Sequence, residues 1–144
     1  MSLRILVAVD GSEYSLRAVE HVLRLRDAHC DIEAHLLNVQ MPLESGHVKQ
    51  FIAREAIEEY YRDEGLAQLQ AASAALEAAE QPCTTHIAVG HIAPTVTRYA
   101  AEMHFDLIVI GTHGRTGLRH AVMGSVATEV IKLATVPVTV VRNA

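Results

Sequence analysis

Five short apolar runs punctuate the chain, and between them apolar residues recur every three to four positions. The runs are rich in Val, Ile and Leu, which is typical of strands buried on both faces of a sheet. They predict strands at Leu3–Val9, Ile32–Val39, Thr84–Val89, Leu107–Ile110 and Val136–Val141. The second is half-polar, because Glu33 and His35 interrupt it.

The segments between the runs predict helices. Ser12 can cap the first, which places Glu13 in its first turn and ends near His29. The stretch 48–80 is helical and acidic, and Gly65 either bends or divides it. A third helix begins near Pro94. A fourth spans Ser125–Ala134.

This alternation of strands and helices predicts a single α/β domain over residues 1–144. Right-handed crossovers make it a doubly wound parallel sheet with helices on both faces. Ligands bind such sheets beyond the carboxyl ends of the strands. The loops after the first and fourth strands are therefore the places to look for function.

The loop after the fourth strand carries a specific glycine spacing. Two residues separate Gly111 from Gly114, and nine separate Gly114 from Gly124. Gly124 and Ser125 then open the last helix. Glycines bring backbone N–H groups close to a ligand, and a helix N-terminus favours anions. With Arg115 nearby, the loop reads as a phosphate cradle, although each glycine alone could simply make a turn. It matches neither the Walker A loop nor the dinucleotide fingerprint.

Asp10 ends the first strand, directly before Gly11 and Ser12. A carboxylate there is either a turn or capping residue or a ligand contact. Its place near the expected reversal of strand order favours a ligand.

The chain resembles the universal stress protein family, in its ATP-binding branch. The resemblance rests on Val7-Ala8-Val9-Asp10-Gly11-Ser12 and on the segment from Asp106 through the glycine motif to Val141. It covers essentially the whole chain and implies a five-stranded sheet in order 3-2-1-4-5, of the adenine-nucleotide alpha-hydrolase-like type.

The resemblance also implies an adenine-nucleotide site. Phosphates would meet the glycine motif, Asp10 the nucleoside, and the Val39 backbone the adenine. The implied contacts are Ala8, Val9, Asp10, Val39, Gly111, Thr112, His113, Gly114, Arg115, Met123, Gly124, Ser125 and Val126. The ligand would be ATP, or AMP or ADP, with Mg²⁺ held mainly through the phosphates.

Binding is favoured over turnover, so no catalytic residue is assigned. Asp10 and His113 are the candidates for a base, and any hydrolysis would be slow. A nucleotide-responsive dimeric regulator of the stress response is thus the leading hypothesis. The alternatives are a slow ATP hydrolase or phosphotransferase, a structural dimer module without nucleotide, and a flavoprotein-like use of a related fold.

The net charge of the chain adds little to this picture, but the distribution of the charges along the chain does. Twelve basic and seventeen acidic residues give −5, which argues against a nucleic-acid polymer as partner. Residues 111–144 carry +3, however, and this positive segment contains the phosphate cradle. No apolar run reaches the roughly 20 residues of a membrane helix, and the N-terminus lacks a signal peptide. A cytoplasmic location is expected.

Three further residue patterns remain. The nine histidines lack metal-ligand spacing, which favours scattered surface residues over a metal site.

Cys30 and Cys83 each precede a strand, so adjacent strands could bring both thiols toward disulfide distance under oxidation. The last strand is apolar on both faces, and as a sheet edge it predicts a homodimer through Val136–Val141.

Overall fold

A computed structural model describes residues 1–43, 53–114 and 123–143. Its sheet has five parallel strands in the order β3-β2-β1-β4-β5, which confirms the expected doubly wound topology. The strands are β1 (Leu3–Ala8), β2 (Ile32–Gln40), β3 (Cys83–Val89), β4 (Leu107–Gly111) and β5 (Val138–Val141). Strand β5 starts two residues later than expected. Pro137 lacks an N–H for the ladder, and only its carbonyl pairs, accepting from Ile108 at 3.0 Å.

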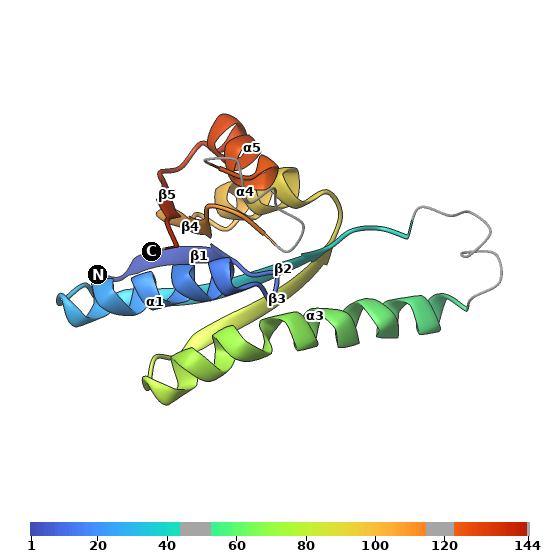
Figure 1. The fold of residues 1–144 in the computed structure, drawn as a ribbon, viewed down its shortest axis with the longest axis horizontal. Coiled ribbons are helices and arrows are strands. Elements are labelled where there is room, and N and C mark those ends of the chain that lie inside the picture. The colour runs from blue at the N-terminus through green and yellow to red at the C-terminus, as the bar shows by residue number, and fades with distance from the viewer. Residues whose placement is uncertain (44–52, 115–122, 144) are drawn as a thin grey trace.

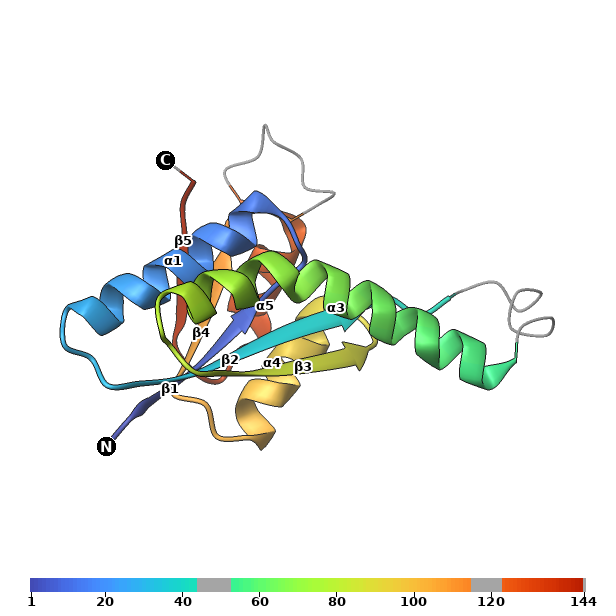
Figure 2. The ribbon, with the colours of Figure 1, turned by 90° about the horizontal axis from the view of Figure 1, so that it is seen from below.

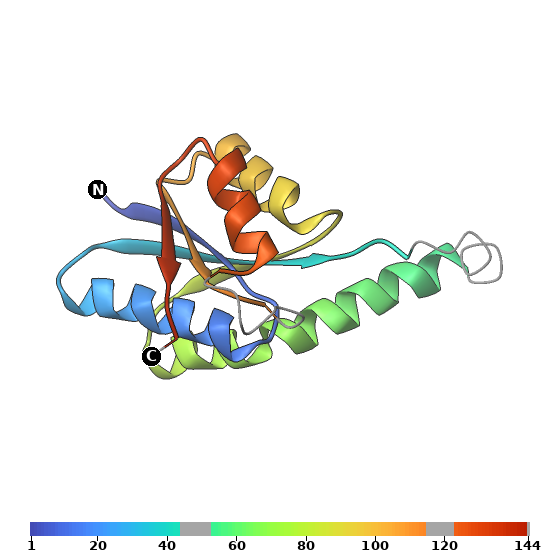
Figure 3. The same cartoon turned by 45° about the horizontal axis from the view of Figure 1, so that its top comes forward.

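The described helices cover both faces of this sheet. They are α1 (Glu13–Asp27), α3 (Arg54–Ala78), α4 (Ile92–Glu102) and α5 (Ser125–Leu133). Helices α1 and α3 lie side by side on one face, and α4 and α5 cover the other (Figures 1 and 2). The first part of α3 extends past the carboxyl ends of the strands (Figures 1 and 3).

Alternation along the strands divides the apolar core into two layers. On the α1–α3 side, Ile5 and Val7 pack with Val19, Val22 and Leu69. On the α4–α5 side the buried layer contains Leu6, Leu37, Val96, Ile108 and Val130. Successive strand residues point to opposite faces, so β1 contributes to both layers. Both faces of the sheet are therefore dry, as the continuous apolar runs indicate.

Gly65 neither divides nor visibly interrupts α3, which runs unbroken from Arg54 to Ala78. A Cβ at Gly65 would lie 2.8–3.0 Å from three side-chain carbons of Ile87 on β3. The glycine is thus explained by close packing of the helix on the sheet.

Helix α4 also begins two residues earlier than expected, at Ile92. Pro94 then sits in the first turn, where a backbone N–H needs no intrahelical acceptor.

Three helices end on a non-glycine residue with positive φ. His29, Glu80 and His104 have φ of 72°, 56° and 56°. In each case the next N–H reaches back to close the helix: Cys30 to Leu25, Gln81 to Leu76 and Phe105 to Ala100, at 2.9–3.1 Å. This is the left-handed helix ending that glycine usually provides. All three helix ends connect to the amino ends of strands, on the side of the sheet opposite the cavity.

Both cysteines are free thiols. Cys83 is in register with Ala34 on the neighbouring strand, whereas Cys30 lies four residues before that position. At about 3.3 Å per residue, the offset along the strand is roughly 13 Å, well beyond disulfide distance. This register argues against a close approach of the two thiols, and their pairing under oxidation stays a prediction. Burial raises the pKa of the Cys83 thiol.

Within the described ranges, no helix combines the length and the apolar character needed to cross a membrane.

Candidate functional site

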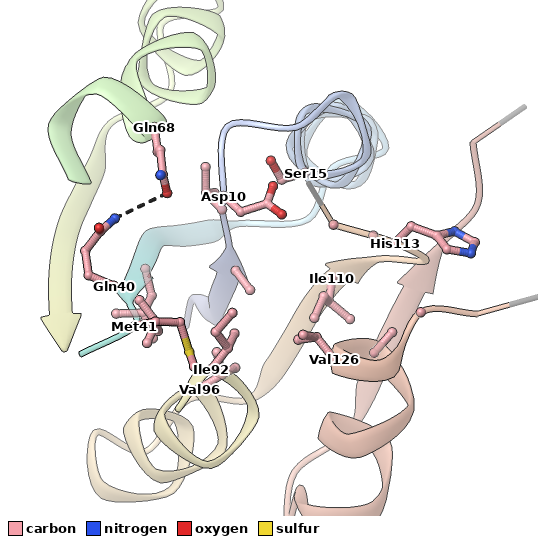
Figure 4. Close-up of a pocket in the computed structure, with 18 of the residues that line it drawn as sticks. Asp10, Ser15, Gln40, Met41, Gln68, Ile92, Val96, Ile110, His113 and Val126 are labelled. Carbon is pink, nitrogen blue, oxygen red and sulfur yellow. Dashed lines mark hydrogen bonds between the residues drawn. The ribbon is translucent and has the colours of Figure 1, made fainter. Parts of the chain in front are cut away.

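A cavity of about 520 Å³ opens at the carboxyl ends of the strands. Its walls come from β1, β2 and β4, from helices on both faces of the sheet, and from the loops after β1 and β4 (Figure 4). Its size lies within the range of small-molecule sites. It occupies the place where the strand order reverses, between β1 and β4.

Most of the residues expected to contact a ligand line this one cavity. They are Ala8, Val9, Asp10, Val39, Gly111, His113, Gly114, Gly124, Ser125 and Val126. Thr112 and Met123 are not among the lining residues. Arg115 lies outside the described residues. The structure thus brings together segments more than a hundred residues apart in the chain.

One end of the cavity is formed by the start of α5. Gly124 is the N-cap, and no described side chain caps the helix. The N–H groups of the first turn have no intrahelical acceptor, and Ser125, Val126 and Ala127 line the cavity. This end therefore offers backbone donors and a positive helix dipole to an anion.

The glycines of the motif serve different purposes. A Cβ at Gly111 would lie 2.6 Å from the carbonyl oxygen of Tyr14, so this glycine lets α1 approach β4. Gly124 donates its N–H to the Thr112 carbonyl at 2.6 Å and closes the loop. A Cβ at Gly114 would lie 2.6 Å from Oδ2 of Asp10. Only Gly114 keeps open a space that belongs to the cavity's own polar groups.

Asp10 shapes a turn and also lies at the cavity. Its Oδ1 accepts the N–H of Ser12 at 2.9 Å, which shapes the turn into α1. The residue also lines the cavity, with its carboxylate between the α1 side and the start of the β4 loop (Figure 4). Glu64 of α3 lines the same cavity and brings a second carboxylate that the sequence reading did not place there.

The cavity also has an apolar part, which we call the apolar slot. It is lined by Leu37 and Val39 of β2, by Ile92 and Val96 of α4, and by Ile110 of β4. These side chains belong to or pack against the α4–α5 core layer. Such a slot suits a flat, apolar group.

A buried amide network forms the wall on the α3 side, and sequence reasoning missed it. Asn38 donates from Nδ2 to the Val9 carbonyl at 2.9 Å and to Oε1 of Gln68 at 2.7 Å. Gln40 donates from Nε2 to Oδ1 of Asn38 at 2.7 Å. Figure 4 shows Gln40 and Gln68 meeting at this wall. Only the register of β2 against α3 creates this network.

The histidines are not all on the surface, which corrects the sequence reading. His35 is buried on the sheet, and its Nδ1 lies 2.8 Å from Nε2 of His86. Its Nε2 bonds Glu33 at 2.7 Å, and this hydrogen bond lowers the pKa of Glu33. Burial, and then the neighbouring His35, lower the pKa of His86. In the described part of the chain, no three His, Cys, Asp or Glu residues are grouped to hold a metal ion.

Comparison with known proteins identifies relatives over the full length. The universal stress protein MJ0531 of Methanocaldococcus jannaschii is 32% identical, covering 97% of this chain and 82% of the relative. YxiE of Bacillus subtilis is 32% identical, covering 96% and 98%. The solved structure of the hypothetical protein MJ0577 superposes with a TM-score of 0.83 at 28% identity, covering 100% and 98%.

More distant structures share the fold and were solved with nucleotides. A universal stress protein from Archaeoglobus fulgidus in complex with dAMP has a TM-score of 0.61 at 24% identity, covering 96% of this chain and 97% of that one. A family protein from Arabidopsis thaliana with AMP bound has a TM-score of 0.70 at 20% identity, covering 99% and 92%.

The model of one family, described as the universal stress protein family, matches residues 1–142. The match includes every described strand and helix. This chain belongs to the universal stress protein family.

Proposed function

We propose that the cavity binds an adenine nucleotide, ATP or its products ADP and AMP. The observation that carries this proposal is the joining, in one cavity, of an uncapped helix N-terminus and an apolar slot. Phosphates suit the first and a purine base suits the second. The nucleotides in the distant structures of the same fold support the same ligand class.

The proposed roles of individual residues are those that the family resemblance implies, and most of these residues line the cavity. Gly111, Gly114, Gly124 and Ser125 surround the phosphates, with Thr112, His113, Arg115, Met123 and Val126 as neighbours in the same segment. Asp10 meets the ribose, beside Ala8 and Val9. Val39 meets the base. Mg²⁺ would be held mainly by the phosphates, and the carboxylates of Asp10 and Glu64 line the same cavity as further oxygen ligands.

The proposed role is that of a nucleotide-responsive regulator in the cytoplasmic stress response. A slow ATP hydrolase or phosphotransferase is the second candidate, and the two cavity carboxylates favour it. One could orient a water and the other retain the metal. Turnover that exceeds background and is lost in Asp10→Asn would establish this second function.

The test of binding uses the wild-type protein. At an ATP concentration about a hundred times Kd, binding stabilises the fold by about 2.7 kcal/mol. We therefore expect a clear rise in the thermal midpoint with ATP, measured by calorimetry, and an adenine nucleotide released from freshly purified protein on denaturation. Absence of both contradicts nucleotide binding.

We also propose a homodimer through β5. This strand is an edge of the sheet, and Val138, Val140 and Val141 are only partly buried. On α5, Ile131 and Leu133 are both 45% exposed. A second copy related by a two-fold axis would cover this apolar edge. Sedimentation at micromolar concentration should show twice the mass of the chain, and a monomer there contradicts the proposal.

A further inference from the structure

The hydrogen-bond ladder between β1 and β2 stops early. Ala8 pairs with Leu37, and the Val9 N–H donates to the Leu37 carbonyl at 2.9 Å. In a regular parallel ladder, the next bond would join the Val39 N–H to the Val9 carbonyl. Among the described residues this bond is absent, and the Val9 carbonyl instead accepts from Nδ2 of Asn38 at 2.9 Å.

The backbone groups of Val39 therefore face an open place. Successive residues of a strand in a parallel sheet send their N–H and C=O groups to alternate neighbours. The Gln40 carbonyl accepts from Gly90, on the β3 side. The N–H and C=O of Val39 must therefore point to the β1 side. There the segment after β1 has already turned away at Gly11, which has a φ of 84°. Val39 lines the cavity at this position.

The amide of Asn38 is locked in the orientation that this arrangement needs. A backbone carbonyl only accepts hydrogen bonds, so the atom facing Val9 must be the nitrogen. The same nitrogen donates to Gln68, and the amide oxygen accepts from Gln40. Asn38 is fully buried, so water does not compete for these bonds. A flipped amide would place two oxygens against each other at Val9.

We infer that Asn38 is a positioning residue for base recognition. By occupying the Val9 carbonyl, it leaves the N–H and C=O of Val39 free as an adjacent donor and acceptor at the cavity. Adenine carries a matching pair, an acceptor ring nitrogen beside its amino group. This inference rests on the proposed function, because it assigns the purine of the bound nucleotide to the Val39 backbone.

The first test needs no variant. Hydrogen exchange by NMR in the ligand-free protein should show a fast-exchanging Val39 amide next to a protected Leu37 amide. Adding ATP should protect Val39, and adding tripolyphosphate, which has no base, should not. A Val39 amide as protected as Leu37 without ligand overturns the inference.

The second test replaces Asn38 with Leu. Without the side-chain donor, the Val39 N–H is free to complete the ladder with Val9. We expect a protected Val39 amide without ligand and about a tenfold loss of ATP affinity, the size of one hydrogen bond. Tripolyphosphate affinity should stay within a factor of two. Equal losses for both ligands would mean general damage to the cavity and overturn the positioning role.

Gln81→Leu is the matched control. Gln81 is another buried amide that donates to backbone carbonyls, those of Ile32 and Pro82, but it lies at the other end of the sheet. Its removal should cost comparable stability and leave ATP affinity unchanged. An equal loss of ATP affinity in this variant counts against the inference. If wild-type protein binds no ATP, the proposed function itself fails. If ATP binds while Val39 is already protected, only the inference fails.

Discussion

Gly111→Ala is expected to lower the free energy of unfolding by about 3 kcal/mol. The new Cβ would lie 2.6 Å from the carbonyl oxygen of Tyr14 and 2.9 Å from its carbonyl carbon. These are backbone atoms in the first turn of α1, so no side-chain rotation relieves the clash. Helix α1 would have to move away from β4, against which it packs. Urea denaturation of the variant and the wild type measures the difference.

Gly90→Ala provides the control for this prediction. A Cβ there meets only the hydroxyl oxygen of Thr95, at 2.8 Å, which is a side-chain atom. The cost should be smaller than at Gly111, because the new Cβ meets a side-chain atom and no backbone atom. Equal destabilisation by both alanines would show that the lost flexibility of glycine, and not the close approach of α1, explains the need for glycine at position 111.

Gly114→Val is expected to weaken ATP binding roughly tenfold to a hundredfold. Its Cβ would lie 2.6 Å from Oδ2 of Asp10, so the valine displaces this carboxylate and fills the phosphate end of the cavity. Losing one or two charge-assisted hydrogen bonds, at about 1.5–3 kcal/mol each, accounts for the size. Calorimetric titration with ATP measures the affinity.

The same Gly90→Ala protein serves as the binding control, since Gly90 is not among the residues lining the cavity. It should bind ATP like the wild type. If Gly114→Val binds ATP as tightly as the wild type, the proposed place of the phosphates at this end of the cavity is wrong, whatever the stability of the variant.

The parallel, doubly wound class of the sheet could be predicted from sequence because it depends on local patterns and on handedness. Apolar runs such as Leu107–Ile110 are short and continuous, and only a covered parallel sheet accommodates several of them. The 3-2-1-4-5 order and the glycine motif came from the family resemblance. The loops after the first and fourth strands both lie at the cavity, because the carboxyl ends of parallel strands lie at the same end of the sheet.

Other features depend on contacts between distant residues and carry little local signal. Gly65 is explained by Ile87, twenty-two residues later and on another element. The helix ends at His29, Glu80 and His104 lack the glycine that usually marks them.

The amide network was missed for the same reason. Asn38 and Gln40 alternate with apolar residues of β2 and resemble ordinary polar positions near a strand end. Their partner Gln68 comes from α3, whose register on the sheet is set by tertiary packing. A buried asparagine inside a predicted strand is the one local signal that could have raised the question.

The two core layers are separated by the sheet along most of its length, yet both reach the cavity. Val9 belongs to the α1–α3 layer and Val96 to the α4–α5 layer, and both line it. A molecule seated there touches both sides at once and makes local opening of either side cost more free energy. A ligand in the cavity would then make unfolding of the two sides more cooperative, even where no helix or strand changes its position.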